Sequence, residues 1–418
     1  METASTFLFI DFGKTFTHYF LVEVASQSFH LQGPVEIPSF FFKKSSDPDS
    51  IFKAGIRQLE ELTQRKLLSN GILVISAKKE QGVGVDEAIF SGGEEWRDKI
   101  DIFQAVKELN LDECLESASA HLTSLDKNFK LIDAGSSAIR FFYQHQDETK
   151  KIYSTFGTGK GAVYLLREEY SPEDILRWLP FEMEVVGLEN FIANKSLFPH
   201  TLPCSERDLA IEGAVLREML RLGKPADFFE DLHAIKILVS GASFSHNPSR
   251  SQVGLIVLDG LEVEGVSEFY LDRRQFLSCF GALIKKHPEL IEKMDLKIPF
   301  EHILTTVAIS GRYQAGEPLG KVLINFGFEE VQKIKVLGGE IYFIPAGNQS
   351  IELEFMLSAK CTVLGINPQD QVKGSLKCSI NTGEKGFIID ARGRPLLCPR
   401  PNIEGRKTIK RWQSAFII

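Results

Sequence analysis

The chain has 418 residues, which is enough for two or three packed units because a single core seldom grows beyond roughly 250 to 300 residues. Apolar residues make up 43% of it and charged residues 25%, proportions that exclude a disordered chain and a coiled coil. The net charge of -8 disfavours a nucleic-acid surface, since neutralising phosphates needs clustered Lys and Arg.

The sequence carries no sign of a membrane segment or a metal knuckle. No window reaches the roughly 18 apolar residues of a spanning helix, and the start METASTFLFID lacks a basic region before a long apolar run. The six cysteines form no CxxC pair or zinc-like spacing and are interpreted as buried or idle thiols. We therefore expect a cytoplasmic protein without a membrane span.

Near the start of the chain an apolar run ends in an aspartate and a small turn. Residues 7–10 precede Asp11, Phe12 and Gly13, and a second apolar run begins at Tyr19, which predicts a β-hairpin. Apolar residues at helical spacing then predict a surface helix over 48–68, with Asp47 or Asp49 as its cap.

The hairpin pattern returns in the middle of the chain. Residues 131–132 precede Asp133, Ala134 and Gly135, and an apolar run follows from Ile139. Two such hairpins so far apart indicate the heads of two related lobes rather than a short-period repeat array.

The rest of the chain alternates helical and strand patterns. Ser205 to Asp208 fits a capping box at the start of a strong helix, and 235–239 reads as a strand that ends at Ser240 and Gly241. Further helices are predicted over 252–260 and 273–286. From about Leu304 onward short β-rich pieces predict a third domain, with a boundary near residue 300.

These turns suit a nucleotide, because a triphosphate needs closely presented backbone N–H groups and a divalent metal held by hard oxygen ligands. Two Asp-x-Gly hairpins facing each other from two lobes would hold the phosphates, with Asp11 and Asp133 as candidate metal ligands. Each hairpin alone is typical of an ordinary turn. The occurrence of two such hairpins, followed in the chain by a strand that ends at Gly241, favours nucleotide binding. Hydroxyl and ammonium donors come from Lys14, Thr15, Ser136 and Ser137.

A glycine-rich stretch over 156–161 does not match the P-loop rule. Ser154 stands where its first glycine is required, and Gly161 stands where the Ser or Thr should be. We interpret the stretch as a mobile connecting turn.

Several segments together resemble the MutL-type proteins associated with adenosylcobalamin-dependent glutamate mutase, within the actin, hexokinase and heat-shock chaperone superfamily. The segments are 177–181, 194–195, 199–203, 214–217, 256–261, 265–266, 270–272, 281–283, 386–396 and Trp412. The resemblance implies an α/β, two-lobed actin-like (ribonuclease H-like) ATPase fold, with lobes over 1–145 and 146–300 and a β-rich C-terminal domain over 301–418.

The resemblance also implies function. It points to ATP and Mg²⁺ as cofactors, to a chaperone-like or reactivating role, and to a protein partner such as a cobalamin-dependent mutase. Carried over by position, it gives a first phosphate loop, a second phosphate loop and an adenosine loop. Their residues are Asp11, Gly13 and Thr15; Asp133 and Gly135; and Val239, Ser240, Gly241 and Ala242.

The chain departs from the family pattern in these loops. Ser136, Ala138, Ile139 and Arg140 replace a glycine, two threonines and an acid of the second loop, and His18 replaces a lysine after the first. A catalytically degenerate scaffold that binds partners with little or no ATP hydrolysis therefore stands as an alternative. A small-molecule kinase is less favoured, because no acid is placed by a motif to activate a substrate hydroxyl.

Overall fold

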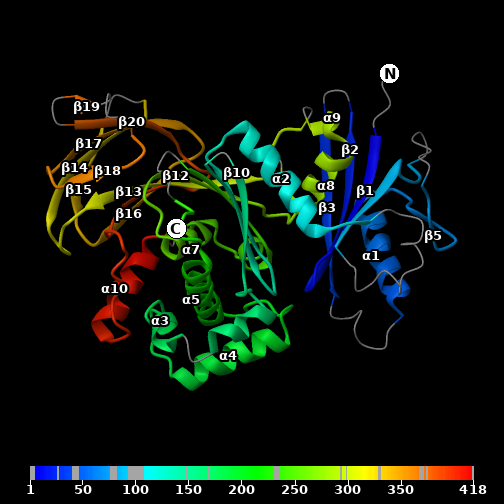
Figure 1. Cartoon of the computed structure of the whole chain (residues 1–418), viewed down its shortest axis with the longest axis horizontal. Helices are drawn as coiled ribbons and strands as arrows, with labels where there is room; N and C mark the ends of the chain where they lie inside the picture. Colours follow the sequence, from blue (N-terminus) through cyan, green and yellow to red (C-terminus); the bar gives the residue numbers. More distant parts are fainter. Residues whose placement is uncertain are drawn as a thin grey trace. The chain divides into compact units, whose positions relative to one another are not determined.

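The computed structural model describes residues 5–25, 28–39, 47–75, 82–92, 108–146, 148–166, 170–229, 235–291, 294–297, 299–327, 331–366, 371–372 and 375–416. The chain folds into two compact units, each built from two separate stretches. The first unit comprises Met1–Asp126 and Asp272–Phe300, and the second comprises Lys127–Leu271 and Glu301–Ile418 (Figure 1).

The first unit is built on a five-stranded sheet in the order β3-β2-β1-β6-β7. Its first three strands are antiparallel, whereas β6 lies parallel to β1 and β7 parallel to β6. The bounds are β1 Ser5–Phe12, β2 Phe16–Val24, β3 Phe29–Pro38, β6 Glu87–Gly92 and β7 Glu108–Leu109, with a small separate pair formed by β4 Leu68–Ser69 and β5 Ile72–Leu73.

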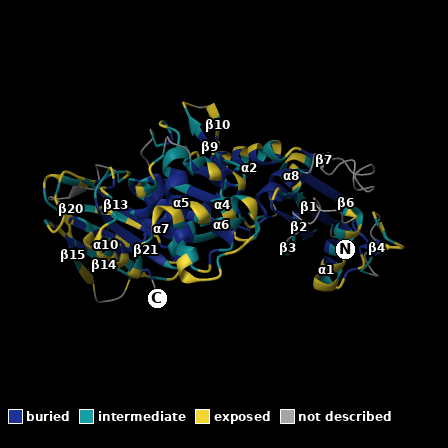
Figure 2. Ribbon diagram, turned by 90° about the horizontal axis from the view of Figure 1, so that it is seen from below, coloured by how far each residue is buried: buried dark blue, intermediate teal, exposed yellow. Residues whose placement is uncertain are grey.

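Helices cover both faces of this sheet, which explains why β1 is a nearly continuous apolar run. Ile10 packs in one core with Phe52 of α1, and the ring of Phe9 lies 6.1 Å from that of Phe276 on the other side. Asp47 caps α1, as predicted, and the helix ends before the predicted position 68. In Figure 2 the strands are buried while α1 carries exposed residues. The helices are α1 Pro48–Thr63, α2 Leu111–Leu125, α8 Leu277–Lys286 and α9 Pro288–Ile291.

The second unit repeats the same strand order within a nine-stranded sheet. Its path is β10-β9-β8-β11-β12-β13-β21-β16, with β18 paired to β13. The first three strands are again antiparallel, and β11 and β12 run parallel to β8. The bounds are β8 Phe129–Ala134, β9 Ile139–His145, β10 Glu148–Ser154, β11 Ile235–Ser240, β12 Gly265–Leu271, β13 Glu301–Gly311, β16 Glu340–Pro345, β18 Cys361–Val363 and β21 Gly386–Ala391.

The orders β3-β2-β1-β6-β7 and β10-β9-β8-β11-β12 are therefore equivalent. In each, the middle strand of the five comes first in the chain, the strand after it is antiparallel to it, and the two strands on its other side are parallel to it. This duplicated arrangement is that of the actin-like, ribonuclease H-like fold, so the predicted fold class is confirmed.

Helices of the second unit pack on its sheet around one large core. Adjacent helices α5 and α7 contribute Leu216 and Leu258 to it, and the predicted capping box is confirmed by Ser205, whose hydroxyl accepts from the backbone N–H of Asp208 at 3.1 Å. The helices are η4 Lys160–Leu166, α3 Pro172–Leu176, α4 Val185–Leu197, α5 Glu206–Gly223, α6 Ala242–Ser245, α7 Arg250–Leu261 and α10 Ile403–Ser414.

The β-rich C-terminal segment shares strands with the α/β part of this unit. Strand β21 turns Ile388 toward the large core and Phe387 and Ile389 toward a second core. That second core is covered by an antiparallel sheet in the order β15-β14-β17-β20-β19. Its strands are β14 Pro318–Asn325, β15 Gln332–Leu337, β17 Ser350–Leu357, β19 Gln371–Val372 and β20 Ser375–Asn381.

The two units follow different bounds from the predicted ranges 1–145, 146–300 and 301–418. Residues 272–300 return to the first unit because Phe276 and α8 complete its core. Residues 301–311 then continue the sheet of the second unit as β13, antiparallel to β12. The return at residue 272 leaves no composition change in the sequence, whereas the step near residue 300 coincides with the β-rich pieces that begin at about Leu304.

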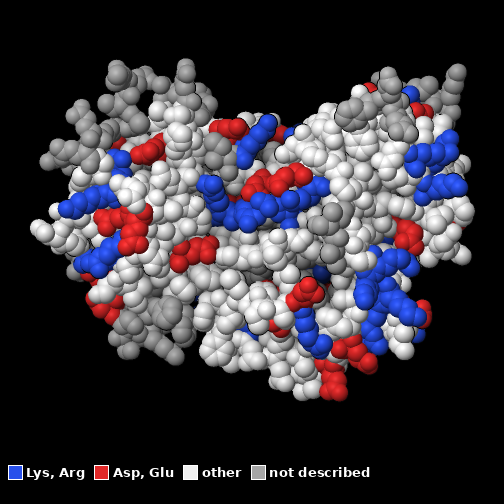
Figure 3. All heavy atoms as spheres, turned by 180° about the vertical axis from the view of Figure 1, so that it is seen from behind, with Lys and Arg blue, Asp and Glu red and all other residues white. Residues whose placement is uncertain are grey.

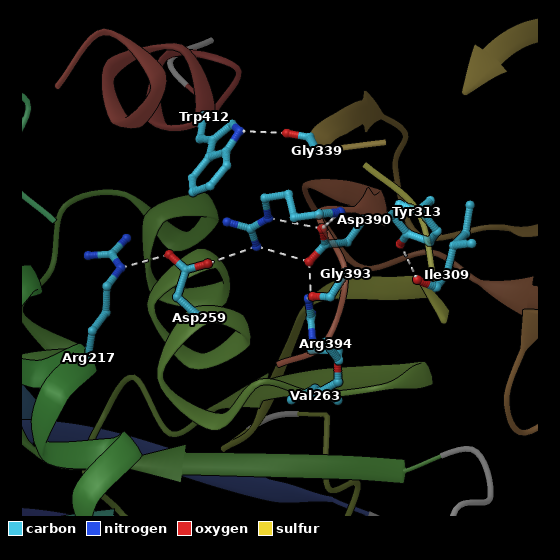
Figure 4. Close-up of polar contacts among 11 residues, drawn as sticks. Arg217, Asp259, Val263, Ile309, Tyr313, Gly339, Asp390, Gly393, Arg394 and Trp412 are labelled. Atoms are coloured by element: carbon cyan, nitrogen blue, oxygen red, sulfur yellow. Dashed lines mark hydrogen bonds and ion pairs between the residues drawn. The ribbon is translucent and has the colours of Figure 1, made fainter. Parts of the chain in front are cut away.

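A buried network of charges fastens the C-terminal segment to the helices of the second unit (Figure 4). Asp259 of α7 accepts from Nε of Arg217 at 2.7 Å and pairs with Nη2 of Arg392 at 2.8 Å. Arg392 also binds Asp390 through Nε at 2.9 Å, and its guanidinium lies 4.9 Å from the ring of Trp412 on α10.

The charge distribution, the cysteines and the helix composition complete the description of the chain. Charges of both signs are interspersed on the face drawn in Figure 3. All six cysteines are free thiols, with Cys114 and Cys279 buried. Among the described residues, no helix combines the length and the apolar composition needed to cross a bilayer.

Candidate functional site

Each unit presents an aspartate at the end of its first strand, opposite a basic residue on the next strand. In the first unit Asp11 is the cross-strand partner of His18. In the second unit Asp133 is the cross-strand partner of Arg140. The same hairpin therefore places a carboxylate against a basic side chain in both halves of the molecule.

The neighbouring parallel strand ends in Ser-Gly in both units. Ser91 lies beside Asp11 in the register of β6, and Ser240 lies beside Asp133 in the register of β11. The structure thus places Ser240, of the predicted adenosine loop, beside Asp133, of the predicted second phosphate loop, whereas Ser91 was not among the predicted site residues. Its signal in the sequence is a strand that ends in Ser-Gly, like 240–241.

The glycines that follow these serines have no room for a side chain. Gly92 has φ +68° and Gly241 has φ +114°, values that L side chains rarely adopt. A Cβ atom would lie 2.8 Å from the carbonyl oxygen of Phe12 and 2.2 Å from that of Ala134, respectively. Both glycines are therefore required for close backbone approach to the strand that carries the aspartate.

The carboxylate of Asp11 is held on both oxygens. Oδ1 accepts from the hydroxyl of Ser91 at 2.8 Å, and Oδ2 lies 3.9 Å from Nδ1 of His18. The other ring nitrogen of His18 lies 3.5 Å from Glu36. Burial disfavours the protonated imidazole, but the two carboxylates outweigh burial and raise the pKa of His18 to about 9.

The residue that follows β3, Ser39, holds the tip of the first hairpin through two hydrogen bonds. Ser39 donates its hydroxyl to the carbonyl of Gly13 at 2.7 Å and its backbone N–H to that of Thr15 at 2.8 Å. Lys14 is exposed at the tip. The hydroxyl of Thr15 is buried and has no hydrogen-bond partner within the described part of the chain.

In the second unit an ion pair holds the strand-end aspartate. Nη1 of Arg140 donates to Oδ2 of Asp133 at 2.9 Å, and both side chains are mostly buried. The guanidinium lies over the turn, because a Cβ on Gly135 would be 3.3 Å from Nη1 of Arg140. Arg140 therefore occupies the place next to the second predicted phosphate loop.

The glycine-rich stretch 156–161, interpreted from the sequence as a mobile connecting turn, packs on this loop. The N–H groups of Gly159 and Gly161 donate to the carbonyl of Ser136 at 3.0 and 2.9 Å, and the N–H of Lys160 donates to the Ser136 hydroxyl at 3.2 Å. A Cβ on Gly157 would lie 2.5 Å from the same carbonyl oxygen. The glycines are needed for this contact, and Ser136 and Ser137 are half-buried beneath it.

The predicted adenosine loop, 239–242, lies partly in the core and partly in the turn between β11 and α6. Val239 is fully buried in the core, so its side chain cannot contact a ligand. Ser240 is nearly buried beside Asp133, and Gly241 and Ala242 begin the short helix α6. The prediction that Asp11 and Asp133 face each other across a cleft stays a prediction.

Mg²⁺, which the sequence resemblance implies at Asp11 and Asp133, does not fit the residues present. A dication next to Asp133 would meet the guanidinium of Arg140, and the electrostatic repulsion opposes binding. Within the described ranges, no three His, Cys, Asp or Glu side chains gather into a metal site.

No protein-family model and no curated protein matches the chain. Among solved structures it is similar to component A of (R)-2-hydroxyglutaryl-CoA dehydratase from Acidaminococcus fermentans, with 12% identity, 69% of this chain and 99% of that chain covered, and a TM-score of 0.39. The ethanolamine utilization protein EutJ from Carboxydothermus hydrogenoformans aligns with 11% identity, coverage of 66% and 88%, and a TM-score of 0.35.

A PPX-GPPA enzyme from Aquifex aeolicus aligns with 10% identity, coverage of 69% and 94%, and a TM-score of 0.31. Likeness at this level says nothing about activity. The fold assignment rests on the strand order that the chain repeats within itself.

Proposed function

We propose that this chain is an ATP-binding protein of the actin-like fold, with a phosphate-binding hairpin turn in each unit. The observation that supports this proposal is a set of three features that occurs in both units: a strand-end aspartate, an Asp-x-Gly turn and a neighbouring strand that ends in Ser-Gly. We call each set a half-site. An Asp-x-Gly turn alone is no evidence for binding, because many ordinary hairpins contain one. Its repetition together with the aspartate and the Ser-Gly strand end is what favours a binding role.

In this proposal the turns serve the phosphates. Glycine leaves a turn without side-chain bulk, so an anion can approach its backbone closely, and Gly13 and Gly135 stand in the two hairpin turns. Lys14 at the exposed tip of the first hairpin supplies a positive charge. The Ser240–Ala242 junction serves the adenosine or its α-phosphate.

The proposed output is a change of conformation that acts on a protein partner. Ligand that binds one arrangement of two units better than another shifts their equilibrium by that difference in affinity. The likeness of several segments to MutL-type proteins supports a chaperone-like or reactivating role toward a cobalamin-dependent mutase. That finer proposal rests on the sequence resemblance alone.

A second candidate function is a scaffold that binds nucleotide or partner without hydrolysis. The pairing of Asp133 with Arg140 favours it, because a carboxylate engaged by a cation is a poor base and a poor metal ligand. The covering of Ser136 by 156–161 favours it as well.

Isothermal titration of the full chain with ATP tests the first proposal. We expect saturable binding, and its loss in Gly135→Val, whose side chain would press on Arg140 and the loop. Gly347→Val is the matched control, because a Cβ there meets nothing within 4 Å. Absence of binding at about 1 mM ATP, a free energy weaker than about -4 kcal/mol, would remove the proposal.

Phosphate release separates the two candidates. A steady ATPase rate that falls in both Asp11→Asn and Asp133→Asn, but not in the exposed control Glu404→Gln, contradicts the scaffold reading. Binding without turnover supports it.

A further inference from the structure

We infer that Arg140 takes the place of the divalent cation, so that this chain binds nucleotide phosphate without Mg²⁺. The inference rests on the proposed function, since it concerns how the same site holds a triphosphate. Four features of the two half-sites lead to it.

The first feature is the position of the guanidinium. Arg140 reaches across the hairpin to Asp133, with Nη1 2.9 Å from Oδ2, and only 18% and 15% of the two side chains are exposed. Gly135, the glycine of the second phosphate loop, leaves the space that this guanidinium fills. The positive charge therefore stands beside the turn where the phosphates would bind.

The second feature is the electrostatics of the pair. Arg140 is protonated at all accessible pH values, so its positive charge is permanent, and it pairs with Asp133 through Nη1. A metal dication recruited to that carboxylate must displace the guanidinium or endure its repulsion at short range. The carboxylate of Asp133 therefore binds the guanidinium of Arg140 in place of a metal ion.

The third feature is the same arrangement in the first unit. Both oxygens of Asp11 already face protein groups, the hydroxyl of Ser91 and the imidazole of His18. His18 stands opposite Asp11 in β2 just as Arg140 stands opposite Asp133 in β9. A basic residue in one hairpin alone could be a chance substitution. Basic residues at the equivalent position of both hairpins indicate that both aspartates are paired with a protein cation.

The fourth feature is the chemistry of arginine toward phosphate. A guanidinium presents a planar fork of N–H donors that matches phosphate oxygens, and it binds them without the water shell that magnesium retains. The first hairpin carries a cation of its own, Lys14, at its exposed tip. Each hairpin therefore carries a positive charge that can bind phosphate.

Titration of ATP into the full chain, once in EDTA and once in excess MgCl₂, tests the inference. We expect the two dissociation constants to agree within about threefold, a small difference on the scale where tenfold corresponds to about 1.4 kcal/mol. Binding that appears only with MgCl₂ overturns the inference and leaves the proposed function standing. Absence of binding in both buffers overturns the proposed function, and this inference with it.

Variants of the pair give a second, independent reading. Arg140→Gln releases the carboxylate of Asp133, and we expect ATP affinity in EDTA to fall by about tenfold or more and to recover with MgCl₂. Arg140→Lys keeps the charge and should remain insensitive to magnesium. Lys151→Gln, on β10 of the same sheet, is the control and should behave as the wild type.

A folding defect is separated from a binding defect by the double variant Asp133→Asn with Arg140→Gln. It leaves no buried charge unpaired, so its thermal melting should match the wild type more closely than that of Arg140→Gln. Magnesium should not restore its affinity. Recovery with magnesium in this double variant contradicts the assignment of Asp133.

Discussion

A carboxylate removed from water needs fixed positive partners, and Asp390 has two. Nε of Arg392 lies 2.9 Å from Oδ1 and Nη2 of Arg394 lies 2.8 Å from Oδ2. Burial alone would raise the pKa of Asp390, but the two arginines outweigh burial and hold it well below its usual range. The residue is therefore ionised and tied to its partners at neutral pH.

Asp390→Ala is expected to destabilise the second unit by about 3–5 kcal/mol, because it removes the buried carboxylate that Arg392 and Arg394 share, although Arg392 keeps its pair with Asp259. Urea unfolding followed by tryptophan fluorescence measures the change, since Trp412 contacts the network. Lys407→Ala removes a pair in which both side chains are mostly exposed, and it should leave the midpoint unchanged. Equal effects of the two substitutions would contradict the role assigned to the network.

At the scale of elements, the junction between β11 and α6 depends on Gly241. Its φ of +114° and the Cβ approach of 2.2 Å to the carbonyl oxygen of Ala134 leave no acceptable position for a methyl group. Gly241→Ala should therefore cost more than about 2 kcal/mol, since the backbone of β8 or β11 must move.

Gly347→Ala is the control for this substitution, because its Cβ would meet nothing within 4 Å and its φ is not in the strained range. We expect it to change stability by less than about 1 kcal/mol, and reduced chain entropy in the unfolded state favours a small gain. Thermal melting of both variants decides the matter. A Gly241→Ala variant as stable as Gly347→Ala would show that the junction relaxes freely.

Local patterns predicted the elements well, because each hairpin and capped helix is specified by residues close in sequence. The capping box at Ser205 and the turns after Asp11 and Asp133 are of this kind. The partner of Asp11 was missed since Ser91 is 80 positions away and joins it only through parallel pairing of β6 with β1.

The pair formed by Arg140 and Asp133 is an intermediate case. Arg140 was recognised as a departure from the family pattern, and its pairing follows from hairpin register once the turn length is known. A turn one residue longer would move the arginine to the other face of the sheet. Residue type alone therefore could not show which charge it would meet.

At the scale of the second unit, side chains from three of the segments named in the sequence analysis, together with Trp412, meet in one buried network. Arg217 lies in 214–217, Asp259 in 256–261 and Asp390 in 386–396, and these side chains belong to the buried network with Trp412 beside it (Figure 4). The network joins helix α7 of the second unit to its C-terminal segment, because Asp259 pairs with Arg392.

Stability of the whole chain should depend on alkaline pH through His18 in the first unit. Its pKa is about 9 in the folded state against an ordinary value of 6.5, because Asp11 and Glu36 face the buried ring. A raised pKa means that the folded state binds the proton more tightly. The stabilisation is therefore complete below pH 6.5 and is lost as pH rises through 9.

The loss should amount to at most about 3 kcal/mol, by linkage. His18→Gln keeps a polar group between the carboxylates but cannot bind the proton, so its free energy of unfolding should lack this decline between pH 6.5 and 9. Urea titrations of wild type and variant across that window measure the difference, with His30→Gln, an exposed histidine of β3, as the control. If wild type and His18→Gln decline in parallel, the proton on His18 does not stabilise the first hairpin, and Asp11 is held by Ser91 alone.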